Sequence, residues 1–202
     1  MKLLVYFLLI VMSYLYGSIP FALVIGKLFY NTDVRESGSR NLGGTNAGRV
    51  LGKKAGLAVI LLDASKCCIS VVISSYVASQ FNYSTDIRYF CALACVIGHC
   101  YPIFAGFRGG KAVSVAIGYA LATNIYAAVI GLVIFLITLK ISKYVSLSSI
   151  LASVTIAVIS PFVGYPTIGV ITNIIIVSLL VYKHKANISR IRNGTESKIT
   201  WM

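Results

Sequence analysis

Long apolar runs are the feature that most constrains this chain. They cover Leu3 to Ile25, Ala55 to Ser79, Tyr89 to Ala105, Ala112 to Leu139 and Val145 to Tyr182. The first two runs are long enough for a helix to cross a hydrocarbon core of about 30 Å. Hydrophobic residues make up 58% of the 202 residues and charged residues 11%, with a mean hydropathy of +0.88. The sequence predicts an all-α, polytopic membrane helical bundle.

The number of crossings depends on how the last two runs divide. Val145 to Tyr182 is too long for one crossing, and we expect it to break around residues 161–166. We expect Ala112 to Leu139 to divide near Thr123 and Asn124, because basic loops then gather on the cytoplasmic side. The result is about seven transmembrane helices, some short, with the N-terminus outside and the C-terminus cytoplasmic. Five or six crossings are the alternatives.

Two polar features lie inside the apolar runs. Gly17, Ser18 and Pro20 predict a kink or a close helix contact in the first run. Asp63 and Lys66 are three residues apart, so they share one helix face and each offsets part of the other's desolvation. Charges at that depth indicate either a functional site or a salt bridge that orients the helix.

The charge balance is strongly basic, with 18 basic and 5 acidic residues and a formal net charge of +13. In a membrane protein, the positive-inside bias, anionic lipids and an anionic substrate each explain such an excess. We do not expect nucleic-acid binding, because no soluble domain presents a basic face. Neither His lies at a ligand spacing from the five cysteines, so no metal site is expected.

We expect one transmembrane domain over residues 1–202. Its cytoplasmic polar segments are expected at about residues 27–54, 106–111, 140–149 and 183–199.

The first polar segment contains GSRNLGGTNAGR, from Gly38 to Arg49. Its glycines let the backbone turn and present N–H groups to an anion. Ser39 adds a hydroxyl, and Arg49 adds a planar charged fork suited to phosphate. The predicted phosphate-binding residues of this segment are Gly38, Asn41, Gly43, Thr45 and Asn46. A loop that binds lipid headgroups is the alternative.

The second segment carries Gly109, Gly110 and Lys111, which we expect at a helix N-terminus. Free N–H groups, the positive end of the macrodipole and a point charge together suit a phosphate. A hinge with a topogenic lysine is the alternative. His99, just before this segment, is expected to be a hydrogen-bonded structural residue.

The third and fourth segments are shorter. The SLSS sequence from Ser146 to Ser149 is expected to cap a helix and to offer hydroxyls to the same site. In the tail, His184, Asn187 and Arg190 are three apart, so they would project from one side of a helix that continues out of the membrane. Glu196 is expected to form a structural salt bridge.

These motifs, taken in order, resemble the signatures of the bacterial acyl-phosphate-dependent glycerol-3-phosphate acyltransferases. The resemblance runs from about residue 13 to 199 and rests on GSIPFALVIGK from Gly17, GSRNLGGTNAGR, the D-x-x-K pair, GHCYPIFAGFRGGK from Gly98, SLSS, and H-x-x-N-I-x-R followed by G-T-E. Members are small inner-membrane enzymes that transfer a fatty acyl group from acyl phosphate to the 1-hydroxyl of glycerol 3-phosphate. The resemblance implies these two substrates, surrounding membrane lipids and no cofactor.

The resemblance also implies roles for individual residues. Ser39 and Arg49 would be essential, Lys111 would hold phosphate with the two glycines before it, and His184 would contribute from the tail. The implied catalytic residues are Ser39, Arg49, Lys111 and His184; further phosphate-binding residues are Gly109, Gly110, Ser146, Ser149 and Asn187; structural residues near the site are Asp63, Lys66 and Glu196.

The chain departs from the family pattern at a few positions. Arg40 and Gly44 stand where the family usually shows Gly and Ala, and Ala112 stands where a Gly is common. We expect Ala112 to alter affinity without abolishing activity.

No H-x-x-x-x-D pair occurs, since Phe104 and Ser189 stand five residues after the two histidines. We therefore expect the glycerol hydroxyl to attack acyl phosphate directly, with a substrate phosphate accepting the proton. His184 as the base is the alternative. A transporter of phosphorylated metabolites or lipid precursors and a non-catalytic protein that binds anionic lipid are the rival functions.

Overall fold

The protein is described by a computed structural model that covers residues 1–199. Every regular element among these residues is a helix. The described part of the chain divides into two compact units, residues 1–122 (unit 1) and the residues from 123 onward (unit 2). The expectation of one transmembrane domain stays a prediction.

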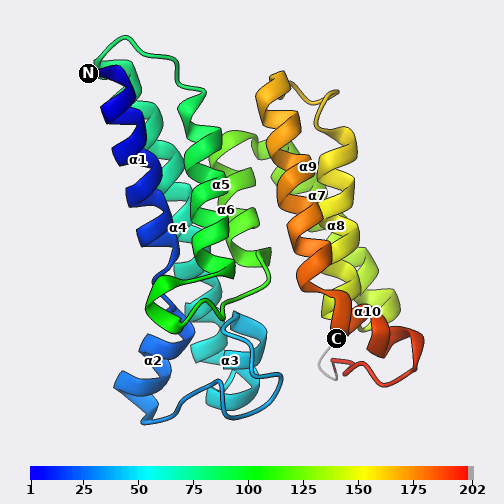
Figure 1. Ribbon diagram of the computed structural model, residues 1–202. Helices are drawn as coiled ribbons and strands as arrows, with labels where there is room; N and C mark the ends of the chain where they lie inside the picture. The colour runs from blue at the N-terminus through cyan, green and yellow to red at the C-terminus, as the bar shows by residue number, and fades with distance from the viewer. Residues whose placement is uncertain (200–202) are drawn as a thin grey trace. The chain divides into compact units, whose positions relative to one another are not determined.

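Unit 1 is built around three long helices. α1 (Lys2–Gly17) packs along α5 (Ile87–Cys100), and both contact α4 (Lys53–Gln80), as Figure 1 shows. The remaining elements are α2 (Phe21–Tyr30), α3 (Gly44–Leu51), the short 3-10 helix η1 (Ile103–Ala105) and α6 (Val113–Thr123), whose last residue begins unit 2.

Glycines allow α1 and α5 to approach closely. A Cβ atom on Gly17 would overlap the backbone of Cys95, and a Cβ atom on Gly98 would overlap the backbone oxygen of Tyr14. Small residues drive such contacts in membranes, where the lipid gives helices no hydrophobic reason to associate. The expected close contact near Gly17 is therefore present.

The first apolar run is interrupted where its sequence indicated. α1 ends at Gly17, α2 begins at Phe21, and the two helices meet at an angle of 42°. Pro20 cannot donate a backbone hydrogen bond, so the helical ladder stops there. The predicted kink is confirmed.

The first polar segment is only partly a loop, and the expectation of a polar loop from Lys27 to Lys54 was wrong. Residues 44–51 form α3, in spite of two glycines that disfavour a helix. The glycines at 44 and 48 let α3 lie against α4, where a Cβ on Gly56 would overlap Gly48. Tertiary packing outweighs the intrinsic cost of glycine in this helix.

Unit 2 contains α7 (Ile125–Ser142), α8 (Val145–Ile159), α9 (Thr167–Lys183) and α10 (Lys185–Arg192). Both predicted breaks are present. Asn124 caps α7 by accepting the N–H of Ala127 at 3.0 Å, and residues 160–166 separate α8 from α9. The expected serine cap is wrong, because Tyr144 holds the N-cap of α8 without a side-chain bond and the serines lie inside the helix.

Within residues 1–199, three helical segments are individually long and apolar enough to cross a membrane: Lys53–Gln80, Ile87–Ala105 and Ile125–Ser142. Two bent pairs, α1 with α2 and α9 with α10, raise the number to five if each pair is one span, whereas α6 and α8 are shorter apolar helices. The seven crossings and their orientation stay a prediction.

Candidate active site

The buried side chain of Asn46 holds the first polar segment together by hydrogen bonds to its backbone. Its side chain, 2% exposed, accepts the backbone N–H of Ser39 at 2.7 Å. Its amide nitrogen donates to the carbonyl oxygens of Val34 at 2.8 Å and Ser37 at 3.3 Å. The expectation that Asn46 offers its side-chain amide to phosphate was wrong, because the loop itself occupies the group. Asn46 instead fixes the position of Ser39.

The polar side chains on the outer side of this segment are open to a ligand. Ser39, Thr45 and Arg49 are all exposed. Thr45 and Arg49 are four residues apart on α3, so they project from the same helix face. Gly38 has a φ of +63°, a left-handed conformation that favours glycine. The hydroxyl of Thr45 and the guanidinium of Arg49 on one helix face form a suitable anion-binding surface.

Asn41 joins the first segment to the second. Its amide nitrogen donates to the carbonyl oxygen of Gly109 at 3.2 Å, and its side-chain oxygen accepts the N–H of Gly43, the N-cap of α3, at 2.9 Å. The structure therefore brings together two predicted phosphate-binding segments that lie far apart in the sequence.

The glycines of the second segment do not present free amides, contrary to our expectation. The N–H of Gly110 donates to the carbonyl of His99 at 3.0 Å, and that of Gly109 to the carbonyl of Cys100 at 3.3 Å. α6 begins only at Val113, two residues after Lys111. Of the features expected here to attract phosphate, the charge of Lys111 and the nearby N-terminus of α6 remain, whereas Gly109 and Gly110 pack closely against His99.

Two departures from the family pattern share one backbone feature. Arg40 has a φ of +57° and Ala112 a φ of +68°. In this left-handed region a Cβ atom is disfavoured, which explains why glycine is usual at both positions. At the third departure, a Cβ on Gly44 would overlap the side chain of Ile60 on α4.

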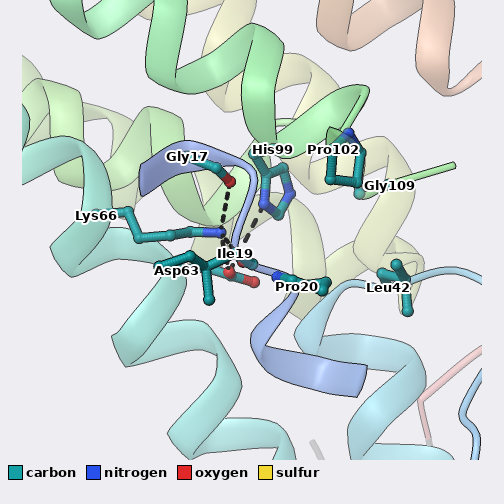
Figure 2. A pocket seen from close by; sticks show the side chains of 10 residues that line it. Gly17, Ile19, Pro20, Leu42, Asp63, Lys66, His99, Pro102 and Gly109 are labelled. Carbon is teal, nitrogen blue, oxygen red and sulfur yellow. Dashed lines mark hydrogen bonds and ion pairs between the residues drawn. The ribbon is translucent and has the colours of Figure 1, made fainter. Parts of the chain in front are cut away.

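Asp63 and Lys66 form a buried ion pair, with 2.8 Å between Lys66 Nζ and Asp63 Oδ1. The ring of His99 lies beside them, with Nδ1 3.6 Å from the same oxygen. Figure 2 shows the three side chains converging beside Pro20 and Gly109. No sequence pattern indicated that His99 meets Asp63. The available signal was that a buried carboxylate requires more than one partner.

In unit 2, Glu196 accepts hydrogen bonds from three side chains. The Ser146 hydroxyl donates to Oε1 at 2.7 Å, the Asn187 amide to Oε1 at 2.6 Å, and Arg190 Nε to Oε2 at 2.7 Å. The expected salt bridge is present. Burial raises the pKa of Glu196, but the hydrogen bonds from Asn187, Ser146 and Arg190 outweigh it, so the pKa lies below its ordinary value.

His184 lies at the bend between α9 and α10, which meet at 55°. The chain continues as a helix beyond this bend, in α10, where Asn187 and Arg190 reach the same carboxylate. His184 is 3% exposed, and its Nδ1 lies 2.8 Å from the carbonyl oxygen of Leu180. If Nδ1 carries the proton, this bond leaves Nε2 as the basic ring atom. Ser149, predicted to offer its hydroxyl, donates it to Val145 at 2.8 Å.

Among residues 1–199, no group of three or more His, Cys, Asp or Glu side chains is placed to hold a metal ion.

Comparisons with known proteins place the chain in a family. The family model described as "Glycerol-3-phosphate acyltransferase" matches residues 7–194. The chain belongs to this family. A glycerol-3-phosphate acyltransferase of Listeria monocytogenes serovar 1/2a is 45% identical over 195 residues, 96% of this chain and 97% of that protein. Glycerol-3-phosphate acyltransferase 2 of Bacillus anthracis is 43% identical over 192 residues, 95% of this chain and 98% of that protein.

Solved structures of the glycerol-3-phosphate acyltransferase family are also similar. The crystal structure of PlsY (YgiH), an integral membrane glycerol 3-phosphate acyltransferase, in its glycerol 3-phosphate form has a TM-score of 0.90 and 37% identity, covering 96% of both chains. The lysophosphatidic acid form has a TM-score of 0.87 and 36% identity, covering 96% of this chain and 95% of that one. The resemblance to the family is thus confirmed.

Proposed function

We propose that the protein transfers a fatty acyl group from acyl phosphate to the 1-hydroxyl of glycerol 3-phosphate. The products are 1-acylglycerol 3-phosphate, a lysophosphatidic acid, and inorganic phosphate. The family match and the two named forms of PlsY support the acceptor and the product. The ordered motif series is the basis for the acyl-phosphate donor.

The structural observation that carries this proposal is the bond from Asn41 to Gly109. It joins the segment that contains Ser39 and Arg49 to the segment that contains Lys111. Both substrates and one product carry phosphate, so a surface with two cations and several hydroxyl groups matches their shared chemistry.

In the proposed reaction, the glycerol hydroxyl oxygen attacks the carbonyl carbon of acyl phosphate. The bond from that carbon to the phosphate oxygen breaks, and phosphate leaves with the electron pair. Arg49 and Lys111 neutralise the phosphates, and Ser39 donates a hydrogen bond near the reacting centre. A substrate phosphate accepts the hydroxyl proton. Phosphate is a good leaving group, so the step does not need a strong protein base.

In unit 2, the family resemblance is the basis for assigning His184 and Asn187 to the same reaction. We place the protein in the bacterial inner membrane with its polar segments on the cytoplasmic side, because most basic residues lie in the breaks between apolar runs. The fatty acyl chain then reaches the reaction from the surrounding lipid.

The experiment that tests the proposal uses the purified full chain in detergent or lipid. It is incubated with acyl phosphate and glycerol 3-phosphate, and released phosphate is measured. We expect release that requires both substrates. The rival transporter would release no phosphate in detergent, and activity with acyl-CoA alone would contradict the proposed donor.

A further inference from the structure

The buried cluster of Asp63, Lys66 and His99 has no assigned part in acyl transfer. Asp63 is 1% exposed, Lys66 0% and His99 6%. Burying charge is costly, and a buried ion pair commonly adds little net stability. The contacts of each residue therefore need another explanation than stability alone.

Lys66 holds the break in the first apolar run. Besides its ion pair with Asp63, its Nζ donates to the backbone oxygens of Gly17 at 3.0 Å and Ile19 at 2.8 Å. All three donors of the ammonium group are used. Two of them bind carbonyl groups that the interrupted helix leaves without intrahelical partners. This part of the cluster is structural.

Asp63 is not fully used by that role. Its Oδ1 serves both Lys66 and His99, and within residues 1–199 its buried Oδ2 has no hydrogen-bond partner. The carboxylate lines a small pocket together with Pro102 and Gly110 (Figure 2). The space open to a water centre is about 10 Å³, close to what one bound water needs.

His99 supports the second phosphate-binding segment directly. Its carbonyl accepts the N–H of Gly110. A Cβ on Gly110 would overlap ring atoms Nε2, Cε1 and Cδ2, and a Cβ on Gly109 would overlap the His99 carbonyl. The orientation of the imidazole therefore determines where Gly110, and with it Lys111, can lie. Asn41 extends the same support to the first segment through the Gly109 carbonyl.

We infer that Asp63 and His99 form a positioning pair for acyl transfer. Asp63 orients the imidazole, and the imidazole sets the backbone that carries Lys111 to a substrate phosphate. Lys66 neutralises Asp63 and anchors it to the helix break. This inference rests on the proposed function, because it needs the second segment to bind a phosphate substrate.

The first test is His99→Leu, which removes the ring nitrogens and keeps the backbone carbonyl. We expect the KM of at least one phosphate substrate to rise about tenfold, because a small displacement of a binding group weakens substrate contacts. His99→Asn, whose side-chain nitrogen can replace Nδ1, should recover part of the loss. A reduced maximal rate with an unchanged KM would show only that less of the enzyme is folded. That result would overturn the inference.

The second test exploits the contact between Gly110 and the ring. Gly110→Ala alone should raise KM strongly. Gly110→Ala combined with His99→Ala should be less impaired than the product of the two single effects predicts, because the shortened side chain makes room for the Cβ. Simple multiplication of the two effects would contradict direct packing as the means of positioning.

Asp63→Asn leaves Lys66 unpaired, and this variant can fail to fold. The double variant Asp63→Asn with Lys66→Met removes both charges together and should still show the higher KM. Asp86→Asn, at an exposed aspartate outside the cluster, is the matched control and should leave both KM values unchanged. If wild-type protein shows no acyl transfer, the proposed function fails; if it turns over and none of the His99 and Asp63 variants changes KM, only this inference fails.

Discussion

The side-chain oxygen of Asn46 accepts the backbone N–H of Ser39 at 2.7 Å. This bond spans a tight segment that begins at the left-handed Gly38, and the same side chain also donates to two backbone carbonyls. A buried asparagine thus holds an exposed serine in one place, which connects the packing of the loop to the reaction assigned to Ser39.

Asn46→Ala should impair both stability and activity. It leaves the Val34 carbonyl buried without its partner, which costs about 1–3 kcal/mol. It also frees Ser39, so we expect kcat/KM to fall by about tenfold or more. Thermal unfolding in detergent and acyl-transfer kinetics measure the two effects. Asn193→Ala, at an exposed asparagine, should change neither. Wild-type kinetics in Asn46→Ala would show that the bond does not position Ser39.

Glu196→Gln should lower the stability of the protein near neutral pH by about 1–3 kcal/mol, because charge-assisted hydrogen bonds are lost. The pKa of Glu196 is lower in the folded protein than its ordinary value of 4.5. Its stabilising effect is therefore complete above that value and is lost as pH falls through the folded pKa.

The measurement for Glu196 is the unfolding temperature between about pH 6 and pH 3. We expect the wild-type value to fall more steeply than that of Glu196→Gln. If the unfolding temperatures of the two proteins fall equally with pH, the Glu196 carboxylate does not stabilise the tail through its charge.

Arg40 and Ala112, which depart from the family pattern and have a positive φ, should respond differently to substitution by glycine. Arg40 is exposed, so Arg40→Gly relieves strain without losing packing, and we expect a gain of about 0.5–1 kcal/mol. Ala112 is 0% exposed. Its Ala112→Gly variant also loses a buried methyl worth about 0.8 kcal/mol, so we expect little net change. Arg108→Gly, at an exposed position without positive φ, should bring no gain. Chemical denaturation gives the ordering, and equal gains at Arg40 and Arg108 would contradict the strain argument.

His184→Gln tests which group accepts the proton. A general base contributes about 10²- to 10⁴-fold to a rate. If a substrate phosphate accepts the proton, kcat should fall by less than about 100-fold with the KM values nearly unchanged. A near-total loss of turnover with substrate binding intact would identify His184 as the base.

The sequence was sufficient to predict the parts of the fold that depend on local chemistry. Apolar runs long enough for membrane helices, the interruption at Pro20 and the break near Asn124 all follow from nearby residues. α3 could not be predicted, because its glycines disfavour a helix locally. The close packing against Gly56 of α4 that outweighs this cost is present only in the folded chain.

The site was predicted less completely than the fold. Thr45 and Arg49 are exposed and their roles stay predictions, whereas Asn46 has the same polar character and donates inward to carbonyl groups. The contact of His99 with Asp63 depends on how α4 and α5 pack, so no local pattern reveals it. The direction in which a side chain points, and whether a backbone amide is already hydrogen-bonded, depend on the folded chain and cannot be predicted from a local sequence pattern.

The central claim is that acyl phosphate is the donor. The most direct measurement supplies purified protein with glycerol 3-phosphate, an acyl phosphate of one chain length and an acyl-CoA of another, both at the same concentration. Mass spectrometry of the lysophosphatidic acid then identifies the donor of each acyl chain. We predict product that carries only the chain from acyl phosphate. Product that carries the chain from acyl-CoA would contradict the account.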